Sequence, residues 1–281
     1  MLAALLVQGP ETIHVGRVVA VHWPQHSSPA AALAEMADAE YQWPGLRSHS
    51  DYPIRLVLAP NERAFDSITG GRLPGWGAGA AFPSTNTIVV VFGANMHQVL
   101  MHELAHLALR RNVRIVPRWF DEGYASRAAG EWRRLDVLRI NWALVRGYAP
   151  ALAEVSRDLR QGGARADAAY AYATTAVLLL ERLGKERGLE PLVTQLAHDP
   201  DFDSALRGTY QLSLGQFEEM WRKDLRTRYG WLSLATSFSI FWTLVGGGVV
   251  IVWWRRRKRD RVRREALNVG WVVPDESDGA S

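Results

Sequence analysis

Residues 99–109 read VLMHELAHLAL, an apolar stretch that contains two histidines and one glutamate. The context predicts a helix, and His102 and His106 are four positions apart, so both imidazoles would lie on one side of it. Two imidazoles in that arrangement can reach a single zinc ion at about 2.0–2.1 Å. Glu103 would project beside the ion, where its carboxylate can hold a water molecule.

A third candidate ligand follows in PRWFDEGYA, residues 117–125. A loop over residues 111–118 lets a second helix turn back, and Glu122 then lies in the first turn of that helix. Catalytic zinc uses three protein ligands and keeps a fourth position open, which two histidines and one glutamate would satisfy. The alternative is that Glu122 is an exposed carboxylate favoured by the helix dipole. Asp121 either orients a ligating histidine or is solvated.

These two segments together resemble a known family. HELAH at 102–106 followed by WFDEGYA at 119–125 is similar to the gluzincin metallopeptidases, and more closely to their small bacterial peptidase MA-like branch. The resemblance covers roughly residues 53–229 and is specific only from His102 to Ala125. It implies a mainly helical, thermolysin-like zincin domain.

The resemblance also implies a set of roles. One zinc ion per chain would be held by His102, His106 and Glu122. Glu103 would act as the base that activates a zinc-bound water, and the substrate would be a peptide or protein whose peptide bonds are hydrolysed. A non-catalytic, membrane-anchored zincin-like binding or scaffold protein, which keeps the zinc helix for structure, is the alternative.

A tyrosine is a further candidate for catalysis. The segment AYAY at 169–172, which leads to LERLG at 180–184, is similar to the tyrosine-containing helix of the same branch. Such a hydroxyl could stabilise the oxyanion as charge develops. Residues two apart diverge on a helix, so Tyr170 and Tyr172 cannot both face the metal. Tyr170 is preferred, with Tyr172 or neither tyrosine as the alternatives.

The pattern of the remaining chain predicts an α+β fold. A small N-terminal mixed sheet over residues 12–95 would pack on a helical part over residues 96–230. Strands are expected at residues 12–21, 53–59 and 87–92, and a glycine-rich loop is expected at residues 70–79. The strand at 87–91 could form a sheet edge that pairs with an extended substrate. Ser213 and Gln216 form a capping box that opens the last helix of this part.

The C-terminal region predicts one membrane-spanning helix. The 23 residues that begin at Leu232 and end at Trp254 contain no charged residue, and about 20 apolar residues cross a bilayer core of about 30 Å. Trp231, Trp253 and Trp254 stand at its two ends, as interfacial anchors do. A buried core helix is the alternative.

The charges that flank this segment predict its orientation. Eight basic residues lie between Arg255 and Arg264, compared with four in the twenty residues before the segment. This bias predicts a cytoplasmic tail over residues 255–281 and a catalytic domain outside a bacterial-type cytoplasmic membrane. The basic cluster would contact anionic lipid headgroups. Residues 1–11, which begin MLAALLV, are interpreted as a possible signal-peptide remnant. A tail-anchored protein with a cytoplasmic domain is the competing topology.

Composition narrows the choice of function. The net charge of +4 comes mostly from the tail, because residues 1–254 carry 25 basic and 24 acidic residues. A near-neutral domain of this kind argues against a nucleic-acid binder. The chain has no cysteine, so any metal must be held by histidine and carboxylate ligands.

Overall fold

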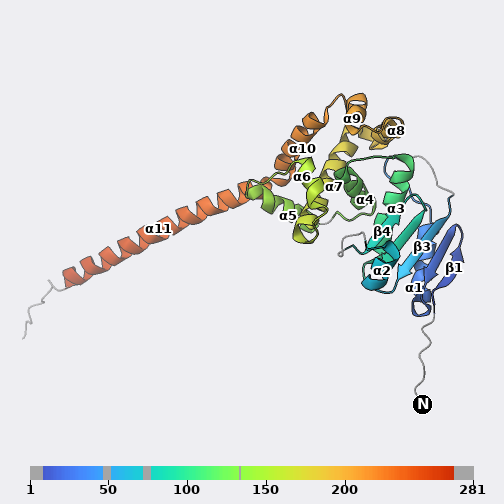
Figure 1. The fold of residues 1–281 in the computed structure, drawn as a ribbon. Coiled ribbons are helices and arrows are strands. Elements are labelled where there is room, and N and C mark those ends of the chain that lie inside the picture. Colours follow the sequence, from blue (N-terminus) through green and yellow to red (C-terminus); the bar gives the residue numbers. More distant parts are fainter. Residues whose placement is uncertain (1–8, 47–51, 72–76, 133, 269–281) are drawn as a thin grey trace, which may run out of the picture. The chain divides into compact units, whose positions relative to one another are not determined.

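The computed structural model describes residues 9–46, 52–71, 77–132 and 134–268. The chain divides into two compact units, Met1–Gly230 and Trp231–Ser281. The described part is mixed α+β, with one five-stranded sheet and eleven α-helices, and most of it is helical (Figure 1). This agrees with the α+β class expected from the sequence. Residues 1–7, interpreted as part of a signal remnant, lie outside the described residues.

The sheet is mixed and lies in the N-terminal part of the first unit. Its strand order is β1-β2-β3-β5-β4. The two outer pairs, β1 with β2 and β4 with β5, are antiparallel, whereas the two central pairs are parallel. The strands are β1 (Glu11–Val15), β2 (Val18–His22), β3 (Ile54–Ala59), β4 (Gly79–Phe82) and β5 (Thr87–Val91).

The expectation of a single strand over residues 12–21 is wrong, because this segment forms the β1–β2 hairpin. Val15 pairs with Val18 across a two-residue turn. Gly16 has φ +50° in that turn, a conformation that glycine adopts without a steric penalty. The alternation of apolar residues continues through so short a turn, so the pattern alone does not reveal it.

The expected edge strand also needs correction. β5 lies between β3 and β4, so it is an interior strand, and β4 is the edge among the described strands. β4 has the sequence GAAF. Glycine and alanine are depleted in strands, which explains why the sequence did not predict a strand there.

Helices cover both faces of the sheet, as Figure 1 shows. α1 (Ser27–Asp38) and α3 (Met96–Asn112) pack on one face through a shared apolar core. α2 (Glu62–Thr69) covers the other face through Phe65. α2 was not expected, although Asn61 caps it by accepting a hydrogen bond from the Ala64 N–H, which is a recognised start signal. A short 3₁₀ helix, Pro24–His26, precedes α1.

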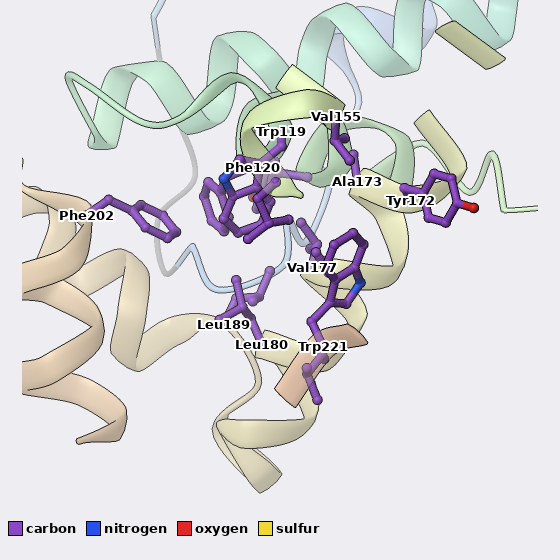
Figure 2. Close-up of a cluster of buried hydrophobic side chains, with 14 of the residues drawn as sticks. Trp119, Phe120, Val155, Tyr172, Ala173, Val177, Leu180, Leu189, Phe202 and Trp221 are labelled. Atoms are coloured by element: carbon purple, nitrogen blue, oxygen red, sulfur yellow. The ribbon is translucent and has the colours of Figure 1, made fainter. Parts of the chain in front are cut away.

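The helical part has its own core, drawn in Figure 2. α4 and α7 are closely packed: a Cβ placed on Gly123 of α4 would lie 2.5 Å from the carbonyl oxygen of Ala173 on α7. The fully buried Trp221 of α10 donates its indole N–H to Thr175 Oγ1 at 3.0 Å. The helices are α4 (Arg118–Ala128), α5 (Arg134–Val145), α6 (Leu152–Asp158), α7 (Gly163–Leu183), α8 (Glu190–His198), α9 (Phe202–Tyr210) and α10 (Leu214–Tyr229), with a 3₁₀ turn at Lys185–Arg187.

The C-terminal helices bear on two expectations. The capping box of Ser213 and Gln216 at the start of α10 is confirmed. The second unit contains α11 (Trp231–Asn268), which includes the predicted membrane span. Within the residues that the structure describes, no helix has both the length and the apolar character required to cross a membrane. The transmembrane helix therefore stays a prediction from the sequence.

Candidate active site

Helix α3 presents one face to the sheet and the other to the helical part. Leu100, Leu104 and Leu107 are buried against the sheet. His102 and His106 lie on a different side of the helix, with side chains only 12% and 13% exposed. The amphipathic pattern of the sequence therefore fixes where the two imidazoles point.

Glu122 of α4 completes a group of three potential ligands. Its Oε2 lies 3.5 Å from Nε2 of His102 and 3.5 Å from Nε2 of His106. The two Nε2 atoms are 3.1 Å apart. These three residues are the group in the described chain whose ligand atoms, all within 4.8 Å of one another, could hold a metal ion.

The donor set fits zinc. Nitrogen and oxygen ligands at about 2.0–2.1 Å in a tetrahedral arrangement are separated from one another by about 3.3 Å. The observed separations of 3.1 Å and 3.5 Å are close to this value on either side. Two neutral imidazoles and one carboxylate are also the ligand types that zinc accepts. The residues present could therefore hold a zinc ion with little rearrangement.

Each histidine also contacts a carboxylate through its other ring nitrogen. Nδ1 of His106 is 3.0 Å from Asp121 Oδ1, and Nδ1 of His102 is 3.2 Å from Glu131 Oε2. A carboxylate at Nδ1 holds the ring in place and leaves Nε2 free for a metal. Asp121 was considered for this role from the sequence. Glu131 was not, because it lies in the loop after α4 and has no recognisable spacing.

The site concentrates charge under cover of the fold. Burial alone would lower the pKa of His102, but hydrogen bonds to Glu122 and Glu131 raise it to about 9. Hydrogen bonds to both histidines overcome burial at Glu122 and hold its pKa well below the usual range. Burial raises the pKa of Glu103. A carboxylate with a raised pKa is a stronger base than an ordinary glutamate.

Glu103 is packed against the edge strand. Its side chain is buried within α3. A Cβ on Gly79 of β4 would lie 2.4 Å from Cγ1 of Val99 and 2.9 Å from Oε1 of Glu103. The lack of a side chain at Gly79 thus lets the backbone of β4 approach this carboxylate closely.

The structure separates the two candidate tyrosines. The ring of Tyr170 lies 6.1 Å from that of His102, and burial together with the charge of Glu122 raises the pKa of the Tyr170 hydroxyl. Tyr172 instead packs edge-on to Trp221 at 6.1 Å. Figure 2 shows the hydroxyl of Tyr172 directed away from the buried cluster. Of the two, Tyr170 is the tyrosine beside the histidines.

A cavity of about 380 Å³ opens over this group. It is far larger than the roughly 30 Å³ that one water molecule occupies. Two arginines lie in its wall: Arg118 Nη2 is 3.3 Å from Glu122 Oε1, and Arg110 Nε is 3.4 Å from Asp121 Oδ2. The cavity is lined by residues 77–83 along β4 and by His102, Glu103, His106, Arg110, Arg118, Asp121, Glu122 and Tyr170.

The family follows from a comparison of the whole sequence. A family model described as the peptidase MA superfamily matches residues 57–227, which is more than half of the chain. The chain belongs to the peptidase MA superfamily. This confirms the resemblance carried by HELAH and WFDEGYA. No curated protein sequence matches the chain. The peptidase MA match extends from β3 to α10, so it includes every residue of the metal group, both tyrosines and the edge strand.

Proposed function

We propose that this peptidase MA chain is a zinc-dependent peptidase of the gluzincin type. The observation that carries the proposal is the convergence of His102, His106 and Glu122 on one point beside a cavity. Zinc, when bound, supplies a Lewis acid that polarises the scissile carbonyl and makes a water molecule acidic. The rest of the chemistry belongs to side chains of this chain.

Glu103 is the proposed general base. Its carboxylate lies in the wall of the cavity that contains the metal group, and burial raises its pKa. It would accept a proton from the attacking water at a carboxylate oxygen. It would then deliver that proton to the nitrogen of the leaving amine as the C–N bond breaks. Because Glu103 is absent from the ligand group, it is free for this transfer.

Tyr170 is the proposed oxyanion partner. Its ring lies next to His102 and in the cavity wall. Its raised pKa keeps the hydroxyl protonated at neutral pH, so it can donate a hydrogen bond to the oxygen on which negative charge develops. Tyr172 has no access to this cavity and takes no part.

The edge of β4 is the proposed support for the substrate backbone. Val91 N–H donates to the Ala78 carbonyl at 2.8 Å, and the β4–β5 register pairs Gly79 with Val90. Backbone groups alternate in direction along an antiparallel strand, so those of Gly79 and Ala81 point away from β5. An extended peptide could add to this edge by main-chain hydrogen bonds.

A non-catalytic scaffold protein is the competing function. A structural zinc site is normally closed by four protein ligands, whereas a catalytic site has three and an open position. The described residues supply three ligands to this group, and the group faces a cavity. Both features favour catalysis.

Cleavage of an unfolded protein or a peptide library by the full chain tests the proposal. The native chain should cleave, a zinc chelator should stop cleavage, and added zinc should restore it. The Glu103→Gln variant should keep its zinc and lose cleavage by a factor of at least 100, within the usual range for a general base. Equal turnover by this variant would exclude the proposed mechanism.

We also propose, from the sequence alone, that residues 232–254 anchor the chain in a bacterial-type cytoplasmic membrane. The support is a stretch of 23 uncharged residues followed by eight basic residues between Arg255 and Arg264. The catalytic unit would then be extracytoplasmic and the tail cytoplasmic. The full chain should resist extraction from membranes by alkaline carbonate. Release into the soluble fraction would refute the anchor and leave the peptidase proposal intact.

A further inference from the structure

A second cavity, of about 300 Å³, adjoins the metal group. Tyr170 lines both this cavity and the one over the histidines. Glu131, which contacts Nδ1 of His102, also lines it. A side chain of a substrate that passes Tyr170 would therefore enter this second cavity.

The second cavity is acidic. Its described lining includes three carboxylates and one guanidinium, which leaves two net negative charges: Glu131, Asp136, Asp167 and Arg139. Arg139 lies 3.2 Å from Asp136 and 3.4 Å from Asp167, and its side chain is 49% exposed. One half-exposed arginine thus serves both aspartates, while Glu131 is held by His102.

Two further features of the wall suit a ligand that donates hydrogen bonds. Ser126 is 2% exposed, and its hydroxyl has no hydrogen-bond partner among the described residues. This buried oxygen lines the cavity, where it could accept a hydrogen bond. Trp132 lines the same cavity, and the face of an indole ring attracts cations.

We propose that this cavity is a specificity subsite for a lysine or arginine side chain of the substrate. The proposal rests on the peptidase function proposed above, and it names the substrate class. A cationic side chain would satisfy the excess carboxylates, place its alkyl stem against Trp132, and donate to Ser126. An acidic side chain could pair only with Arg139 and would meet three carboxylates.

Peptide binding to the Glu103→Gln chain separates the subsite from catalysis. Fluorescence anisotropy would compare peptides that carry lysine, arginine, norleucine or glutamate at each position. One position should favour lysine or arginine over norleucine by about 10-fold or more, as expected for hydrogen bonds to a charged group. Adding Asp136→Asn and Asp167→Asn should reduce this ratio to near one and leave norleucine binding unchanged.

Two variants protect this test from trivial outcomes. Asp66→Asn makes the same chemical change on exposed α2 and should leave the ratio unchanged. Arg139→Gln removes the competing guanidinium and should increase the ratio, a gain that misfolding cannot produce. No preference at any position, a preference for glutamate, or a ratio unaffected by the two Asp changes would overturn the subsite.

The two proposals fail separately. If the native chain cleaves peptides without preferring basic residues, the subsite is wrong and the peptidase function stands. If Glu103→Gln shows the basic preference but the native chain never cleaves, the cavity binds basic peptides and the peptidase function is wrong.

Discussion

Glu131 Oε2 lies 3.2 Å from Nδ1 of His102, although the two residues are 29 positions apart. His106 has an equivalent partner in Asp121, at 3.0 Å. Both imidazoles are thus held by a carboxylate behind the ring, with Nε2 of each directed to Glu122. Glu131 comes from the loop after α4, and its backbone N–H donates to the Ser126 carbonyl at 2.9 Å. This loop places the carboxylate.

The first prediction concerns Glu131 as a positioning residue. Glu131→Ala should weaken zinc affinity by about 10- to 100-fold, because the His102 ring loses its orienting acceptor. Glu131→Gln, which keeps an acceptor oxygen, should recover part of the loss. Competition with a zinc chelator measures both. Glu219→Ala, on an exposed part of α10, is the control. Unchanged affinity in Glu131→Ala would refute the role.

The second prediction concerns the close approach of β4 to Glu103. In Gly79→Ala the new Cβ would overlap Val99 and press on the Glu103 carboxylate. We expect kcat/KM to fall by at least 10-fold while the chain keeps one zinc ion. Gly215→Ala adds a methyl group where no atom lies within 4 Å and should not reduce activity. Full activity in Gly79→Ala would show that the contact is unimportant.

The third prediction concerns pH and the metal-free chain. The pKa of His102 is about 9 in this state, compared with an ordinary value of 6.5. Between these values the folded chain holds more protons than the unfolded chain, so the free energy of unfolding should fall as pH rises from 6.5 to 9. Zinc must displace the same proton, so zinc affinity should increase over that interval. Calorimetric zinc titrations and denaturant unfolding at several pH values measure the two trends. A flat response in both would contradict the charge assignment.

The fourth prediction concerns the core that supports α7. Trp221 is fully buried and bonded to Thr175, so Trp221→Ala should reduce the free energy of unfolding by about 3–5 kcal/mol. Trp142 on α5 is 56% exposed, and Trp142→Ala should change stability by less than about 0.5 kcal/mol. Denaturant unfolding of the two variants provides the comparison. Similar losses in both would mean that the α7–α10 packing is not what stabilises this part.

The sequence was most informative where local geometry determines the outcome. His102 and His106 are one helical turn apart, so their convergence follows from the helix itself. Glu122 required only a short loop and the start of the next helix. The choice between Tyr170 and Tyr172 could be stated from the sequence as a choice, but it needed the packing of α7 on α4 and α10 to be resolved.

Other parts depend on contacts that local patterns do not record. Glu131 reaches His102 through the tertiary path of a loop, and the β4 edge consists of small residues with no strand signature. Gly16 and Arg17 form a turn inside a segment whose alternation reads as one strand. α2 is a different case, since the Asn61 cap was present in the sequence and was overlooked.

The central claim is that His102, His106 and Glu122 hold one zinc ion. The zinc-to-protein ratio of the purified full chain, measured by elemental analysis after dialysis against metal-free buffer, tests it most directly. We predict about one zinc per native chain, about one in Glu103→Gln, and almost none in His106→Ala. A native chain without zinc, or a His106→Ala variant that retains a full equivalent, would contradict the account.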